Sequence, residues 1–164
     1  MRIYVPSTTS ELTELRDEEL LPGPRAATAL TSELREWYVD DDTEELEYAA
    51  LLEAARLSLR MVDADPSAAR RRVVIAAEVA DSSVAPDMGS GRGSVRLVGE
   101  LGLAQVVSLH VDGPDAEPAV AAATAVVIEA DLGSEDAQFV VDEAEAHELG
   151  WYATQELGPL LELL

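Results

Sequence analysis

Aromatic side chains are scarce in this chain, and their scarcity limits how it can build a core. The 164 residues include two Trp, four Tyr and one Phe, although 48% of the residues are hydrophobic. Alanine, leucine and valine must therefore fill most of the interior. Because each of these side chains buries little area, the elements that carry them must pack closely. A chain of this length is expected to form one globular domain, residues 1–164, around one core.

The charge is strongly negative, and the basic residues are all of one kind. The chain has 33 acidic residues against 11 basic ones, all arginine, which gives a net charge of −22. Such a charge opposes binding to nucleic-acid phosphates and to anionic membranes, so we expect neither partner. It is compatible with plain solubility, with attraction to a basic protein and with life at high salt. The absence of lysine and asparagine, which have AT-rich codons, favours a high-GC genome as its origin.

The absent residue types exclude several kinds of active site. Without lysine and cysteine, the chain has no Schiff-base lysine, cysteine nucleophile, thiolate metal site or P-loop lysine. We predict no cofactor. Residues 1–6 lack the apolar region of a signal peptide, and no apolar run approaches the roughly 20 residues that span a bilayer. These observations favour a cytoplasmic protein.

The clearest local pattern predicts a long helix from Asp42 to about Asp65. Asp42 and Glu45 have capping-box spacing, and apolar residues then recur at helical intervals. Its opposite side is expected to be a solvent stripe of Asp42, Glu45, Ala49, Glu53, Arg56, Arg60 and Asp63. Further helices are expected at about 9–20, from a cap at residue 31 or 32 to residue 38, at 116–126, 134–146 and after 154. Strands are expected at 3–5, 73–79, 95–99 and 106–111, and residues 25–31 are compatible with a short strand or a loop.

The segment 147–152 is ambiguous. Its alternation, with His147, Leu149 and Trp151 on one side, favours a strand. The alternative is a helix that continues to Leu149, with Gly150 just beyond its end. In sum we predict an α+β fold: a two-layer sandwich with a mixed sheet of four to five strands and about five helices packed on it.

Two basic features offer candidate chemistry. Residues 70–72 are three consecutive arginines, which can bind an external anion or, as we favour, pair with the chain's own carboxylates. His110 is followed by Asp112 on the same face of an expected strand, which permits a His–Asp pair at the strand end. No GxSxG motif supplies a nucleophile for such a pair. A hydrogen-bonded structural histidine is therefore the favoured interpretation.

A metal site is an alternative interpretation of the region around His147. If the preceding acidic helix continues, Glu143 and His147 share a helix face at the i,i+4 spacing, and Glu148 is adjacent. A histidine with carboxylates can bind a divalent metal ion. No HExxH motif is present, and 33 acidic residues make chance proximity common. We do not favour a metal site, and keep Glu143, His147 and Glu148 as the alternative.

Most of the aromatic residues occur in two Trp–Tyr pairs, at 37–38 and 151–152. These pairs can plug the ends of an alanine-rich core, or they can form a patch that binds a ligand or a partner. The candidate ligand- or partner-binding patch consists of Arg35, Trp37, Tyr38, His147, Trp151 and Tyr152.

Four stretches carry a family resemblance: MRIYVP at the start, LREWY and EELEYAAL in the middle, and EDAQFVVDEAEAHELGWY near the end. Over most of its length the chain resembles a family of small acidic proteins of unknown function from high-GC actinobacteria. The resemblance implies an intracellular bacterial protein. It implies no activity and no functional residue.

A hypothesis of function follows by exclusion, because each catalytic template lacks at least one required residue. We expect a non-enzymatic cytoplasmic domain that binds a protein partner or a small molecule. One alternative is a metal-dependent hydrolase with carboxylate–histidine chemistry. Another is an acidic mimic of nucleic acid, which requires the carboxylates to form a continuous stripe. The sequence does not indicate an oligomeric state.

Overall fold

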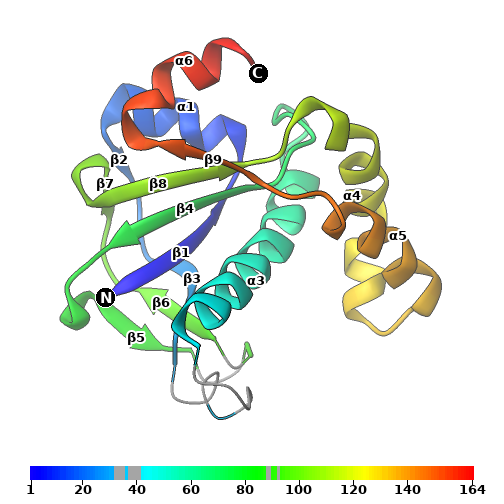
Figure 1. The fold of residues 1–164 in the computed structure, drawn as a ribbon, viewed down its shortest axis with the longest axis horizontal. Coiled ribbons are helices and arrows are strands. Elements are labelled where there is room, and N and C mark those ends of the chain that lie inside the picture. The colour runs from blue at the N-terminus through cyan, green and yellow to red at the C-terminus, as the bar shows by residue number, and fades with distance from the viewer. Residues whose placement is uncertain (32–35, 37–41, 88–89, 92) are drawn as a thin grey trace.

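A seven-stranded antiparallel sheet forms the centre of the computed structural model, which describes residues 1–31, 36, 42–87, 90–91 and 93–164 (Figure 1). The strand order is β5-β6-β3-β1-β4-β8-β9. The strands are β1 (Arg2–Ser7), β3 (Arg25–Ala29), β4 (Val73–Glu78), β5 (Val84–Pro86), β6 (Ser94–Leu97), β8 (Val106–Val111) and β9 (Gly150–Ala153). A separate two-stranded ribbon pairs β2 (Leu20–Leu21) with β7 (Leu101–Gly102).

The expected mixed sheet of four to five strands is wrong, since the sheet has seven strands and every neighbouring pair is antiparallel. Two strands lack a clear strand pattern: β3 reads RAATA, where the sequence permits a short strand or a loop, and β5 reads VAP. Alanine and proline are depleted in strands. These segments are extended because β6 pairs with both of them. Tertiary pairing therefore adds strands that the local sequence does not predict.

The described residues form five α-helices, in agreement with the prediction of about five: α1 (Thr9–Glu18), α3 (Thr43–Ala64), α4 (Glu117–Asp131), α5 (Glu135–Glu145) and α6 (Leu157–Glu162). The predicted long helix is confirmed as α3, and the Asp42 carboxylate accepts a hydrogen bond from the Glu44 N–H (3.0 Å). The strand interpretation of the tail is confirmed for residues 150–152, which belong to β9. None of these helices is long and apolar enough to cross a membrane.

Helices cover both faces of the sheet. On β1, Ile3 and Val5 belong to a core cluster with apolar residues of α1 and α6, whereas Tyr4 belongs to a cluster with α3. Figure 1 shows α3 lying across one face, while α1 and α6 lie together away from it. The expected two-layer sandwich is therefore also wrong. The cluster between α3 and the sheet is rich in alanine, including Ala50 and Ala54 on α3 and Ala76 on β4. These small side chains let the helix lie close to the strands.

The hairpin of α4 and α5 packs against α3 through a third cluster, and ion pairs fix it there. Arg56 on α3 donates to Asp131 (3.1 Å) and to Glu145 (3.0 Å), and Arg60 donates to Asp131 (2.6 Å). Burial alone raises the pKa of Asp131, but the hydrogen bonds from Arg60 and Arg56 hold it below its usual value. Arg56, a member of the expected solvent stripe, is only partly exposed (23%), because its side chain lies against this hairpin.

The most deeply buried ion pair of the described chain joins Arg72 and Asp112, which are 1% and 0% exposed. Asp112 accepts hydrogen bonds from the Arg72 Nε (2.8 Å), Nη2 (2.8 Å) and backbone N–H (2.7 Å). The same Nη2 also donates to the carbonyl of His147 (2.7 Å). The pair thus connects the start of β4, the end of β8 and the chain that leads into β9.

Replacing Arg72 by methionine is expected to lower the free energy of unfolding by about 3–5 kcal/mol, because it leaves the Asp112 carboxylate buried and unpaired. Urea denaturation followed by circular dichroism measures the change. Arg16→Met is the matched control, because Arg16 pairs with Asp17 on the surface and its loss should change the stability far less. Equal losses in the two variants would contradict this role of the buried pair.

Candidate functional site

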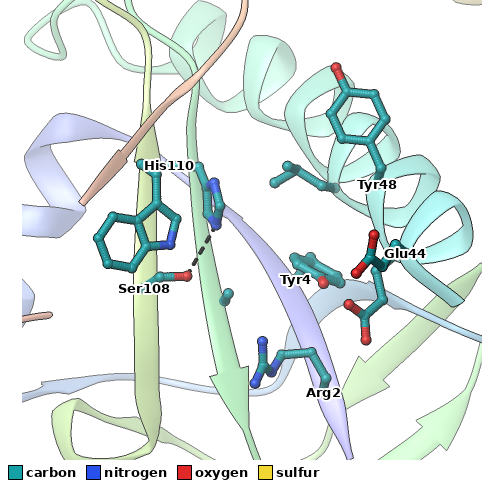
Figure 2. Close-up of a pocket in the computed structure, with 10 residues that line it drawn as sticks. Arg2, Tyr4, Glu44, Tyr48, Ser108 and His110 are labelled. Carbon is teal, nitrogen blue, oxygen red and sulfur yellow. Dashed lines mark hydrogen bonds between the residues drawn. The ribbon is translucent and has the colours of Figure 1, made fainter. Parts of the chain in front are cut away.

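A pocket of about 240 Å³ lies between the N-terminal half of α3 and the face of the sheet that α3 partly covers. Figure 2 shows Ser108 and His110 on one side of it and Tyr4 and Glu44 on the other, with Arg2 at one end. The pocket is lined by Arg2, Tyr4, Glu44, Glu47, Tyr48, Leu51, Ala76, Ser108, His110 and Trp151.

Strand register explains why residues so far apart in sequence meet here. Tyr4 on β1 lies opposite Ala76 on β4, and Ala76 lies opposite Ser108 on β8. His110, two residues further along β8, therefore lies on the same face as Ser108. It lies opposite Trp151 on β9. Across the pocket from the sheet lie side chains of α3: Glu44, Glu47, Tyr48 and Leu51. Their spacing of three and four residues places them on one side of the helix.

The space itself arises from a small side chain. Ala76 stands between Tyr4 and Ser108 in the row across the sheet, and it is buried. Its methyl group leaves room that a leucine or valine at this strand position would fill. The pocket is therefore deeper at Ala76, between the phenol ring of Tyr4 and the hydroxyl of Ser108.

Ser108 and His110 form the polar side of the pocket. The Ser108 Oγ lies 3.1 Å from the His110 Nε2, and either atom can be the donor of this hydrogen bond. Burial, with a smaller contribution from the positive charge of Arg2, lowers the pKa of His110. The imidazole is therefore neutral at pH 7, and it presents one donor and one acceptor rather than a positive charge.

Arg2 and Tyr4 form the end of the pocket nearest the start of β1. The Arg2 Nε donates to the Glu78 carboxylate (2.8 Å) on the neighbouring strand β4. Burial, and then the negative charge of Glu47, raise the pKa of the Tyr4 phenol. Tyr4 consequently remains protonated at neutral pH and keeps a hydroxyl donor beside the guanidinium.

Two aromatic side chains are exposed around the pocket. Trp151 is 63% exposed and Tyr48 is 52% exposed. Trp151 comes from the edge strand β9, whereas Tyr48 comes from α3. Large aromatic side chains usually bury most of their surface, so these two rings are available for contact with another molecule.

The structure separates the members of the sequence-predicted patch that it describes. Trp151 lines the pocket, but Tyr152, the next residue on β9, packs against the core cluster on the other face of the sheet. His147 lies in the connection between α5 and β9, with its Nδ1 4.0 Å from a carboxylate oxygen of Asp115. Arg35, Trp37 and Tyr38 lie outside the described residues.

The other candidate groups take structural positions. The His110–Asp112 pair that the sequence permits does not form, because Asp112 is bound to Arg72. The arginine run bonds internally: Arg71 to Glu117 (2.8 Å), Arg72 to Asp112, and Arg70 to the carbonyl of Val62. In the described part of the chain, no three His, Asp or Glu residues are arranged to hold a metal ion. The alternative set of Glu143, His147 and Glu148 forms no such group.

The sequence reasoning missed most of the pocket. The sequence did not indicate Arg2, Tyr4 or Ser108, and for His110 it favoured a hydrogen-bonded structural role, with which the bond to Ser108 agrees. One signal was available: Ser108 and His110 place two polar groups on the same face of an otherwise apolar strand. Their meeting with Tyr4 and Trp151 depends on strand order, which the sequence did not show.

Comparison with known proteins bears on the identity of this chain. A family described as a family of unknown function (DUF6912) matches residues 1–161. The chain belongs to DUF6912. Its expected resemblance to a family of unknown function is thereby confirmed. Searches of curated proteins and of solved structures found no match for this DUF6912 chain.

The lowered pKa of His110 in this DUF6912 protein should appear as pH-dependent stability. Below about pH 6.5 the unfolded chain binds a proton at His110 that the folded chain does not. The free energy of unfolding should therefore fall as the pH drops from that value to the lower pKa of the folded state. His110→Gln should lose less stability than the wild type between about pH 8 and pH 5.

Urea denaturation at both pH values, with an NMR titration of the His110 ring, measures this difference. Arg2→Met should raise the pKa of His110 toward its usual value, because it removes the neighbouring positive charge. A His110 ring that titrates at or above about pH 6.5 in the wild type would contradict the assignment.

Proposed function

We propose that this protein binds a small organic molecule in the pocket between α3 and the sheet. The observation that carries the proposal is the exposed indole of Trp151 next to His110, its partner across strands β9 and β8, which is itself hydrogen-bonded to Ser108. An apolar ring surface next to a few fixed polar groups is typical of small-molecule sites. The polar groups are already hydrogen-bonded to one another, so they are held in place before a ligand arrives.

The size of the pocket favours a free small molecule over a protein segment. Its volume of about 240 Å³ lies just below the usual range of about 300–1,000 Å³ for ligand sites. One ring with a short polar substituent matches this space. The aliphatic side chain of Leu51 and the methyl group of Ala76 offer that ring an apolar contact.

Trp151→Ala should weaken the binding of aromatic fragments about tenfold or more, equivalent to about 1.4 kcal/mol, because the indole face is lost. Ligand-observed NMR with a library of one-ring fragments measures the effect. Phe139→Ala is the matched control, since Phe139 is 66% exposed on α5 and does not line the pocket. Fragments that bind wild type and Trp151→Ala equally would contradict the proposal.

The Ser108–His110 hydrogen bond of 3.1 Å also favours a second candidate function, acyl transfer. In that reaction the Ser108 Oγ would attack the carbonyl carbon of an ester while its proton passes to the His110 Nε2; the ester C–O bond would then break, and His110 would return the proton to the departing alcohol. Among the described residues, no carboxylate is hydrogen-bonded to His110 to orient the ring, as such a mechanism usually requires. Binding is therefore the better supported function.

A fluorophosphonate probe separates the two functions, because it labels only serines whose hydroxyl is activated. The binding proposal expects no labelling of Ser108 at neutral pH. Mass spectrometry of the intact and digested chain measures the adduct. Labelling that Ser108→Ala and His110→Ala both abolish would favour acyl transfer instead.

A further inference from the structure

We propose that the ligand of this pocket is an organic cation, an inference that rests on the proposed binding function. The first observation is the balance of charge around the pocket. Arg2 is the cationic side chain of the lining, and its Nε is 2.8 Å from the Glu78 carboxylate. Glu78 and Asp81 together compensate Arg2 and the neighbouring Met1 ammonium, which lies 3.5 Å from Glu78 and 3.4 Å from Asp81. His110 contributes no positive charge, because burial keeps the imidazole neutral.

Two carboxylates of the lining form no ion pair with another described residue, and the one compensating feature is the positive end of the α3 dipole near Glu44. Glu44 and Glu47 lie on α3, on the side of the pocket across from the sheet. Neither has an ion-pair partner within the ranges that the structure describes. The negative charge of Glu47 reaches into the pocket, since it contributes to the raised pKa of Tyr4. A positively charged ligand would supply the missing counter-charge.

The aromatic lining favours the same kind of ligand. The rings of Tyr4, Tyr48 and Trp151 come from β1, α3 and β9, so they approach the pocket from different sides. The face of an indole or phenol ring attracts a cation, and tryptophan does so most strongly. Rings combined with carboxylates recognise an ammonium group that carries an apolar substituent.

The polar side of the pocket accepts an ammonium donor as well. A neutral His110 and the Ser108 hydroxyl both carry lone pairs, and neither repels a positive charge. An anionic ligand would instead meet Glu44 and Glu47 without a free counter-charge opposite them. The net charge of −22 further raises the local concentration of cations at the surface.

Three one-ring probes that differ in charge test the inference: benzylammonium, benzyl alcohol and benzoate. Trp37→Phe provides the background, because Trp151 is then the sole tryptophan of the chain and its fluorescence reports binding. Benzylammonium should bind about tenfold more tightly than benzyl alcohol, as expected for a cation beside aromatic rings and carboxylates. Benzoate should bind most weakly.

Glu44→Gln combined with Glu47→Gln should remove most of the preference for benzylammonium over benzyl alcohol. The matched control is Glu14→Gln combined with Glu53→Gln, which removes the same charge from exposed positions outside the pocket and should keep the preference. A preference that falls equally in both double variants would assign it to net charge and overturn the inference. Thermal melting of each variant confirms that the fold is retained.

The three-probe measurement also distinguishes failure of the cation inference from failure of the proposed binding function. If benzyl alcohol binds at Trp151 as tightly as benzylammonium, the cation inference is wrong and the binding pocket stands. If none of the three probes changes the Trp151 signal at millimolar concentration, the proposed binding function is contradicted and the cation inference falls with it.

Discussion

The buried ion pair between Arg72 and Asp112 is the contact on which the geometry of the pocket depends. It sits where β4 begins and β8 ends, and its additional bond to the His147 carbonyl holds the chain just before β9. Separating the two charges would leave each of them desolvated without a partner, which is strongly unfavourable. Alternative registers of β4 against β8 are therefore disfavoured. The register that results places Ser108 and His110 opposite Ala76, Val74 and the strand that carries Trp151.

Small side chains produce both the core and the pocket. Ala50 and Ala54 on α3 are fully buried over the sheet, so the helix lies close to the strands. Towards the N-terminal end of α3 the longer side chains Glu47, Tyr48 and Leu51 line the space instead. Ala76 lies below them and does not fill the gap. The pocket is thus a consequence of the same alanine-rich composition that makes close packing necessary elsewhere.

Elements with a strong local sequence pattern could be predicted, whereas the pairing of strands could not. The long helix was predictable because Asp42 caps it and its apolar residues recur over 22 residues. The strand at 150–152 was predictable from its alternation. For β3 the sequence left a short strand or a loop open, because RAATA becomes extended only by pairing between β1 and β6. The pocket was missed for the same reason: Tyr4, Ser108 and Trp151 become neighbours only when the strand order is known.

The few aromatic residues and the large negative charge act together at this pocket. A core of alanine, leucine and valine does not require Trp151 or Tyr48, and both remain exposed. Exposed rings favour self-association, but a net charge of −22 makes copies of the chain repel one another within the Debye length of about 8 Å at physiological salt. The charge thereby keeps the aromatic rings accessible to solvent. The electrostatic field of this negative charge attracts positive ions. It therefore favours cationic ligands, as Glu44 and Glu47 also do.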